Sequence, residues 1–227
     1  VADEAIRHAV TKLAHLHLAA TAQSRTRLIR MGEAPAAVFN VGSPAVDGLN
    51  AADPADDAPE VVMIQHPIGA PAGQEKRWAL ATLSATRRFN RLIMAPNHDP
   101  GREGIGAALA ATKTKAIAHL PRARFVSLLR GAKLIVGNSS AGLIEAAALK
   151  VPAVNVGPRQ AGRQKPANVV DCNYGRVNVA RGICRALRLD LRRLHHPYGN
   201  GQAGRKIADL LARIDLATVG IRKRNTY

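Results

Sequence analysis

Short apolar runs rich in Val and Ile alternate with segments of helical periodicity over most of the 227-residue chain, and this alternation constrains the fold more than any other feature. Strands of this kind are buried on both faces, which is typical of a parallel sheet covered by helices. Beyond residue 60 the expected strands are 60–67, 91–97, 116–121, 133–140, 151–157 and 167–172. The expected helices are 74–88, 101–114, 122–132, 141–150, 175–188 and 202–214. The sequence therefore predicts an α/β fold in which helices cover both faces of a parallel sheet.

A stretch without periodicity divides this pattern in two. Residues 47–60, DGLNAADPADDAPE, are rich in Asp, Ala and Pro, which predicts a linker. Before the linker, the same alternation predicts helix 5–16, strand 15–21, helix 24–33 and strand 37–44, in a chain that starts on Val1 inside a helical pattern. The pattern thus divides the chain into 1–46, the linker at 47–59, an α/β domain at 60–200, and a final helix and tail at 201–227.

The chain carries 33 Lys and Arg against 16 Asp and Glu, a formal charge of +17, and this excess favours phosphorylated or polyanionic partners. A solvated surface that is rich in arginine, without any anionic partner, would account for the same excess of positive charge. No block of five Lys or Arg occurs, and only 3% of the residues are aromatic, so the chain lacks the stacking platform of many nucleic-acid-binding proteins. We therefore do not expect a nucleic-acid partner.

The apolar runs are short. None approaches the ~18 residues of a membrane span, and nothing resembles a signal peptide. The two cysteines, Cys172 and Cys184, form no metal-binding pattern and are most simply reduced thiols. We therefore expect no membrane partner and a cytoplasmic location.

Polar side chains follow the ends of several predicted strands. The carboxyl ends of parallel strands meet at one edge of a sheet, where folds of this class bind their ligands. The residues expected at this edge are His66, Asn97, Asp99, Asn138, Ser139, Ser140 and Arg159. An imidazole, an amide, hydroxyls, a helix N-terminus and a guanidinium suit a pyrophosphate and sugar hydroxyls. The edge has no cluster of carboxylates, so neither a metal nor another cofactor is expected.

Each of these residues also has an ordinary structural explanation. His66 can end a strand, Asn97 can form an Asx turn, and Arg159 can be a surface arginine. The serines of GNSS can cap a helix, and Glu145 can complement the dipole of that helix. Their joint position at one predicted edge favours a binding site.

Several motifs together identify a family. They are IQHP (64–67), APNHDPG (95–101), GNSSAGLIEA (137–146), VNVGPRQAGR (154–163) and HPYGNGQAGRKIADLL (196–211). With these motifs, and with IRHAVTKLAHLH and SRTRLIRMGE near the start, the chain resembles the hydrolysing UDP-N-acetylglucosamine 2-epimerases over nearly its whole length. The related non-hydrolysing epimerases carry different histidine and serine motifs, so the hydrolysing branch fits better.

This resemblance implies a fold of glycosyltransferase-B type, in which two Rossmann-like domains face a cleft and UDP is held mainly by the second. Residues 1–46 are then expected to be the tail end of the N-terminal Rossmann-like domain, and 60–200 the C-terminal, UDP-binding one. It implies UDP-binding roles for His66, Asn97, Leu120, Ser139, Ser140, Glu145 and Arg159. The Glu145 carboxylate is expected to accept the ribose hydroxyls, and the Leu120 backbone to meet the uracil. The serines, with a helix N-terminus near Ala141, are expected to bind phosphate oxygens, and helix 202–214 is expected to cross back onto the N-terminal domain.

By the same resemblance, the reaction converts UDP-N-acetylglucosamine to N-acetylmannosamine and UDP, for the synthesis of sialic or related nonulosonic acids. UDP leaves by anti elimination across C1–C2, and water then adds to the 2-acetamidoglucal. The candidate catalytic residues are His66, Asp3 and Arg7, although Asp3 and Arg7 also fit an i,i+4 surface pair.

The resemblance also carries expectations about the whole protein. Family members are longer, so the 227 residues are expected to bind UDP without full activity, and the full-length form is expected to be a homo-oligomer. The sequence does not choose between UDP-N-acetylglucosamine and a diacetamido relative as the sugar nucleotide. Two other functions stay open, a UDP-sugar transferase of glycosyltransferase-B type and a basic binding module without catalysis.

Overall fold

The computed structural model describes residues 2–215 and Lys223, without the side chains of residues 2–4. The chain forms two compact units, one made of 1–48 with 197–227 and the other of 49–196. We describe each unit by itself. Among the residues that the structure describes, no helix combines the length and the apolarity that crossing a membrane requires.

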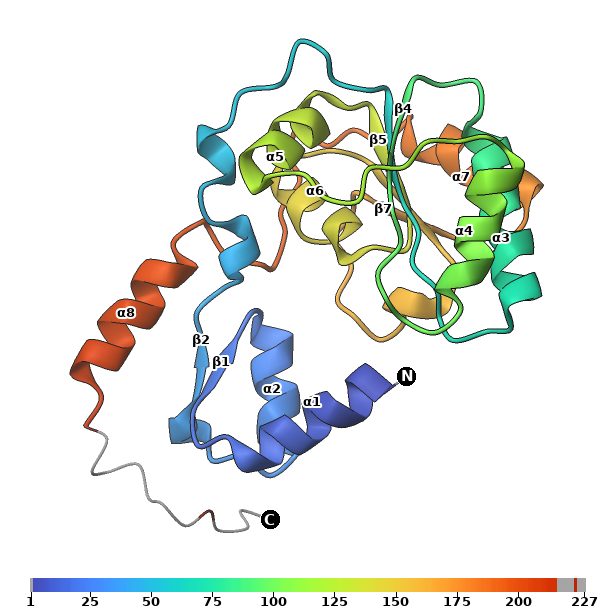
Figure 1. The fold of residues 1–227 in the computed structure, drawn as a ribbon. Coiled ribbons are helices and arrows are strands. Elements are labelled where there is room, and N and C mark those ends of the chain that lie inside the picture. The colour runs from blue at the N-terminus through green and yellow to red at the C-terminus, as the bar shows by residue number, and fades with distance from the viewer. Residues whose placement is uncertain (1, 216–222, 224–227) are drawn as a thin grey trace. The chain divides into compact units, whose positions relative to one another are not determined.

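The larger unit is built on a five-stranded parallel sheet, which confirms the predicted α/β class (Figure 1). Its strands are β3 (Val61–Ile64), β4 (Arg91–Met94), β5 (Leu134–Gly137), β6 (Ala153–Val156) and β7 (Val169–Cys172). In space their order is β4-β3-β5-β6-β7. The chain therefore steps from β3 to β4 on one side and then returns to place β5 on the other side. This reversal creates a topological switch point between β3 and β5, where such sheets open a crevice for ligands.

Helices cover both faces of this sheet (Figure 1). One face packs against α3 (Ala72–Thr86), α4 (Arg102–Ala111) and α7 (Arg176–Ala186), and the other against α5 (Arg122–Gly131) and α6 (Glu145–Ala148). Alternate residues of the central strands serve opposite faces, so that Val61 packs with α7 and Val62 packs with α5. Both valines have no exposed surface, and burying each such side chain stabilises the fold by roughly 1.5–3 kcal/mol.

Two expected elements differ in the structure. The strand expected at 116–121 is reduced to one bridge between Ile117 and Met94. Ile117 is 40% exposed at this margin and is the only large apolar residue before Leu120, so little burial favours a longer pairing.

The helix expected at 141–150 is also broken. It consists of a 3₁₀ turn, Ser140–Gly142, followed by the single turn of α6. Gly142, a weak helix former, ends the 3₁₀ turn. The fully buried Asn168 holds the segment in this form, because its Nδ2 donates to the carbonyl of Gly142 at 3.1 Å and to that of Val151 at 2.9 Å. The expected dipole of a long helix is therefore absent from this segment.

Gly137, the first residue of the GNSS motif, is required by the sheet itself. It pairs with Ile64 of β3 and has a φ of +137°. A Cβ at this position would lie 1.9 Å from the carbonyl oxygen of Ile64. No side chain is compatible with that approach, so the glycine lets the ends of β3 and β5 come together.

The smaller unit contains a two-stranded parallel sheet with helices beside it. Its elements are α1 (Ala2–Leu13), β1 (His17–Ala19), α2 (Ala22–Arg30), β2 (Val38–Asn40) and α8 (Ala203–Arg213). Short 3₁₀ turns at Pro35–Ala37 and Pro44–Val46 flank β2. The Asp47 carboxylate accepts hydrogen bonds from the amides of Ala203 at 2.9 Å and Gly204 at 2.6 Å. This carboxylate therefore caps α8 from a distant part of the sequence.

A buried carboxylate organises the other end of this unit. Glu33 is 3% exposed, forms ion pairs with Lys12 at 2.9 Å and Lys223 at 2.5 Å, and shares a hydrogen bond with Nε2 of His17 at 3.0 Å. Burial disfavours its charged form, but the hydrogen bonds from Lys223 and Lys12 outweigh this and lower the pKa of Glu33 from 4.5 to about 2. The ionised carboxylate thus joins α1, β1 and the C-terminal segment.

We predict that Glu33→Gln lowers the free energy of unfolding at neutral pH by about 2 kcal/mol, because it removes the charge that three partners stabilise. A depressed pKa contributes stability above the unfolded value of 4.5, and this contribution is lost as the pH falls toward 2. The stability difference between the two proteins should therefore shrink over that interval. Urea denaturation across the acid range measures it, and a difference that is absent at neutral pH or unchanged in acid contradicts the prediction.

Candidate functional site

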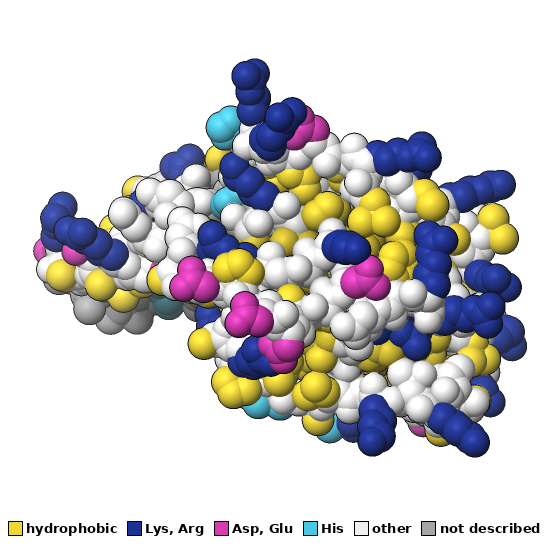
Figure 2. All heavy atoms as spheres, turned by 90° about the horizontal axis from the view of Figure 1, so that it is seen from above, with side chains coloured by type: hydrophobic (Ala, Val, Ile, Leu, Met, Phe, Trp, Pro, Cys, Tyr) yellow, Lys and Arg dark blue, Asp and Glu magenta, His cyan; other side chains and the backbone are white. Residues whose placement is uncertain are grey.

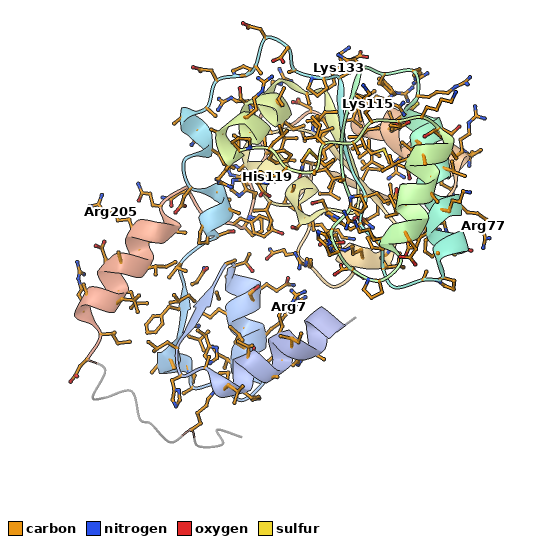
Figure 3. All side chains as sticks on the ribbon, in the orientation of Figure 1. Arg7, Arg77, Lys115, His119, Lys133 and Arg205 are labelled. Atoms are coloured by element: carbon orange, nitrogen blue, oxygen red, sulfur yellow. The ribbon has the colours of Figure 1, made fainter. Side chains whose placement is uncertain are left out.

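The predicted polar residues of the larger unit lie at the carboxyl edge of its sheet. His66 follows β3, Asn97 follows β4, Asn138 follows β5 and Arg159 follows β6. Lys133, which precedes β5, marks the opposite, amino edge (Figure 3). The structure therefore brings to one edge the side chains that the strand pattern placed there.

Asn138 connects the two strands at the switch point. It has no exposed surface, and its Oδ1 accepts the amide proton of His66 at 2.7 Å while its Nδ2 donates to the carbonyl of His66 at 2.8 Å. Its backbone carbonyl accepts from Nε2 of Gln160 at 2.7 Å and from Nη1 of Arg159 at 3.3 Å. Through one residue, the loops after β3, β5 and β6 are fixed to one another.

His66 is held as a neutral imidazole. Its Nδ1 accepts the backbone N–H of Asn97 at 3.1 Å, so the proton of the neutral ring lies on Nε2. Burial, with repulsion from the nearby Arg159 guanidinium, lowers the pKa of His66 to about 4, although the Asp99 carboxylate acts in the opposite direction. At neutral pH the side chain therefore offers one N–H donor and no positive charge.

Arg159 is the cation of this edge. Its side chain is 26% exposed, and Nη2 lies 3.8 Å from the carboxylate of Asp99, beyond hydrogen-bond distance. Asp99 also accepts a hydrogen bond of 2.5 Å from Nδ2 of Asn97. The guanidinium is thus steered by Asp99 and Asn138 but keeps donors for an additional anion.

The remaining predicted residues lie around the broken helix and the loop before α5. The Ser139 Oγ accepts the amide proton of Ala141 at 3.3 Å and caps the 3₁₀ turn, whereas the hydroxyl of the half-buried Ser140 forms no hydrogen bond with another described residue. Burial raises the pKa of Glu145 above its usual range. Neither the amide nor the carbonyl of Leu120 bonds to another described residue, so both remain available as donor and acceptor.

Four residues that the sequence left without a role support this edge, namely Gln160, Trp78, Tyr174 and Gly157. Gln160 lies inside a quoted motif and donates to the backbone carbonyl of Asn138, as described above. Trp78 of α3 stacks on Tyr174, which follows β7, with ring centres 4.0 Å apart and planes 9° apart. A Cβ on Gly157 would lie 2.3 Å from the Tyr174 ring, so this glycine lets the β6 loop pass over the stack. No local sequence pattern signals a pairing of residues so far apart.

Two predicted catalytic residues belong to the smaller unit. Arg7 is exposed on α1 (Figure 3), and the side chain of Asp3 lies outside the described residues. Their catalytic roles stay predictions. Among the residues whose side chains the structure describes, no group of three or more His, Cys, Asp or Glu is placed to hold a metal ion.

The larger unit is thus a Rossmann-like domain. The carboxyl edge of its sheet presents N–H donors and the Arg159 guanidinium near the switch point between β3 and β5. The sequence model of the UDP-N-acetylglucosamine 2-epimerase family matches residues 1–212. The chain belongs to this family.

Curated relatives show the same kinship. A UDP-N,N'-diacetylbacillosamine 2-epimerase (hydrolysing) from Legionella pneumophila is 32% identical over 245 aligned residues, which cover 99% of this chain and 64% of the relative. A UDP-N-acetylglucosamine 2-epimerase from Neisseria meningitidis is 32% identical over 82% of this chain and 54% of its own length. The chain thus spans about half to two thirds of these relatives.

Solved structures share the fold. The crystal structure of UDP-GlcNAc 2-epimerase from Neisseria meningitidis bound to UDP-GlcNAc has a TM-score of 0.68 and 17% identity, over 90% of this chain and 63% of that one. An identity this low shows the fold alone. The shared fold confirms the fold class of glycosyltransferase-B type that the resemblance predicted.

The tautomer of His66 leads to a prediction with two matched variants. His66→Asn retains an acceptor for the Asn97 amide but loses the Nε2 donor, whereas His66→Gln retains a donor near Nε2 and loses the acceptor. If the donor binds an anion, His66→Asn should weaken UDP binding by roughly 1.5–3 kcal/mol and His66→Gln by clearly less.

Isothermal calorimetry measures both affinities, and circular dichroism checks that both variants are folded. Equal losses would mean that His66 acts only through the loop geometry.

Proposed function

We propose that the carboxyl edge of the larger unit binds UDP, and that the protein is a hydrolysing UDP-N-acetylglucosamine 2-epimerase. The observation that supports this most directly is the bonding of Asn138 to His66 across the switch point. It fixes a neutral N–H donor and the Arg159 guanidinium at the place where sheets of this topology bind nucleotides. The names of the Legionella and Neisseria relatives supply the substrate class.

The diphosphate is the part of the substrate that this edge suits best. Arg159 offers charge and paired donors, His66 offers an uncharged N–H, and Ser140 offers a hydroxyl without a protein partner. A neutral histidine approaches Arg159 without repelling it, so both groups can contact one diphosphate. The same contacts stabilise the negative charge that grows as UDP leaves C1.

The nucleoside is assigned to the other side of the Asn138 loop. Glu145 is an acceptor when ionised, and burial makes its charged form costly until donors approach, as two ribose hydroxyls would. Leu120 carries a free amide and carbonyl, which can pair with the edge of a uracil ring. Uridine recognition is thus assigned to α6 and the loop before α5.

The chemistry we propose is an elimination followed by a hydration. A base removes the proton from C2 while the C1–O bond to UDP breaks, which gives 2-acetamidoglucal and UDP. Water then supplies a hydroxyl to C1 and a proton to C2, and N-acetylmannosamine results. Arg159 and His66 act on the leaving group, and Asp3 and Arg7 are the candidates for the proton at C2. We place the product upstream of sialic or nonulosonic acid synthesis, with a diacetamido sugar nucleotide as the other substrate candidate.

The reaction path predicts a distinctive product in heavy water. The protein as its gene encodes it should release UDP and N-acetylmannosamine that carries deuterium at C2, because hydration of the glucal takes its C2 proton from solvent. The 227 residues alone should bind UDP and turn over little, since the relatives are longer. Proton NMR follows the C2 signal, and Arg159→Ala should slow UDP release without unfolding the protein.

Other products would contradict this proposal. UDP with N-acetylglucosamine that retains hydrogen at C2 would indicate simple hydrolysis or transfer to water. UDP-N-acetylmannosamine without free UDP would indicate the non-hydrolysing reaction.

A further inference from the structure

A groove of about 810 Å³ runs along α7 on the surface of the larger unit. One wall is α7 itself and the other is the end of α3. None of His66, Asn138 and Arg159 lines it. The epimerase chemistry proposed above does not use this groove.

The groove is strongly basic. Five arginines line it, namely Arg87, Arg88, Arg176, Arg181 and Arg185, and all five are exposed. Among the described lining residues none is acidic, and none of the five arginines forms an ion pair with a described residue. Figure 2 shows Lys and Arg crowded along the edge where α3, α4 and α7 lie, with hydrophobic side chains between them.

The spacing of the arginines on α7 lowers the stability of that helix. Arg181 and Arg185 are four residues apart, so their like charges repel on the same face of the helix. Between the arginines the floor is apolar, with Val177 60% exposed beside Ala180 and Ile183. Arg88 also lies over the ring of Phe89, 5.0 Å from its centre, but none of the five has an ionic partner among the described residues. An apolar strip flanked by such cations is complementary to a surface with the opposite pattern, an apolar strip flanked by carboxylates.

We propose that this groove docks an acidic amphipathic helix of a partner protein. From Arg176 to Arg185 the lined part of α7 spans about 14 Å, which matches two to three turns of a helix. Leu or Ile side chains of the partner would cover Val177 and Ala180, and Glu or Asp side chains would pair with the arginines. The described lining contains no aromatic residue, which disfavours stacked nucleotides, and its hollow shape disfavours a flat membrane.

Cys184 provides a reporter inside the groove. Its side chain is exposed among the lining residues, whereas Cys172 is half-buried and burial raises its pKa to about 11. A thiol reagent should therefore label Cys184 first. A bound helix should cover this thiol and slow its labelling.

The probe is a synthetic amphipathic peptide of about fourteen residues, with Leu at i, i+3 and i+4 spacing and Glu on both flanks. Its control is the same composition in scrambled order. We expect the ordered peptide to bind in fluorescence anisotropy and to slow Cys184 alkylation about fivefold. Arg181→Glu with Arg185→Glu should weaken binding about tenfold, and Lys113→Glu with Lys115→Glu, the same charge change outside the groove, should not.

Several results would overturn the proposal. Equal binding of the scrambled peptide, or equal losses in the groove and control variants, would show attraction by net charge alone. Protection of Cys184 that grows with protein concentration and without peptide would assign the groove to a second copy of the chain. Displacement of the peptide by RNA or by anionic vesicles, with the same loss in the groove variants, would assign it to those ligands.

Discussion

The carboxyl edge of the larger unit, the candidate site, depends on the hydrogen bonds of one buried residue, Asn138. Its amide pairs with both backbone groups of His66, beyond the last paired residues of β3 and β5. The backbone carbonyl of Asn138 accepts hydrogen bonds from the side chains of Gln160 and Arg159 in the loop after β6. Loss of this side chain would leave the amide and carbonyl of His66 unpaired, at a cost of roughly 1–3 kcal/mol for each buried group. The order of the strands, the close approach of Gly137 to Ile64 and the hydrogen bonds of Asn138 together fix the loops that an anionic ligand would contact.

Charge at this edge is set by burial. A charged His66 would face Arg159 in a poorly solvated site, so the ring stays neutral and its position is secured by the Asn97 amide. Arg159 has only the distant carboxylate of Asp99 as an ionic partner among the described residues. A diphosphate would satisfy this guanidinium better than Asp99 does, because phosphate oxygens can accept two parallel hydrogen bonds.

The sequence predicted the sheet because its five strands are short, largely apolar runs, most of them rich in Val and Ile, whose burial needs no distant information. The strand expected at 116–121 is reduced to one bridge because Ile117, its only large apolar residue before Leu120, remains 40% exposed. The helix expected after GNSS is broken near Gly142, whose carbonyl accepts a hydrogen bond from Asn168, a residue far along the chain. The stack of Trp78 on Tyr174 likewise joins residues from α3 and the end of β7. Motifs predicted which residues gather at the edge, but such long-range contacts decide how they are held.

Calorimetric titration of UDP into the 227-residue chain, in the presence of a chelator, tests the central claim most directly. The account predicts one-to-one binding that added Mg²⁺ does not strengthen, because a guanidinium and N–H donors replace the metal as partners of the diphosphate. Arg159→Ala should weaken this binding by roughly 1.5–3 kcal/mol. Absence of binding by the folded chain, or binding that appears only with Mg²⁺, would contradict the account.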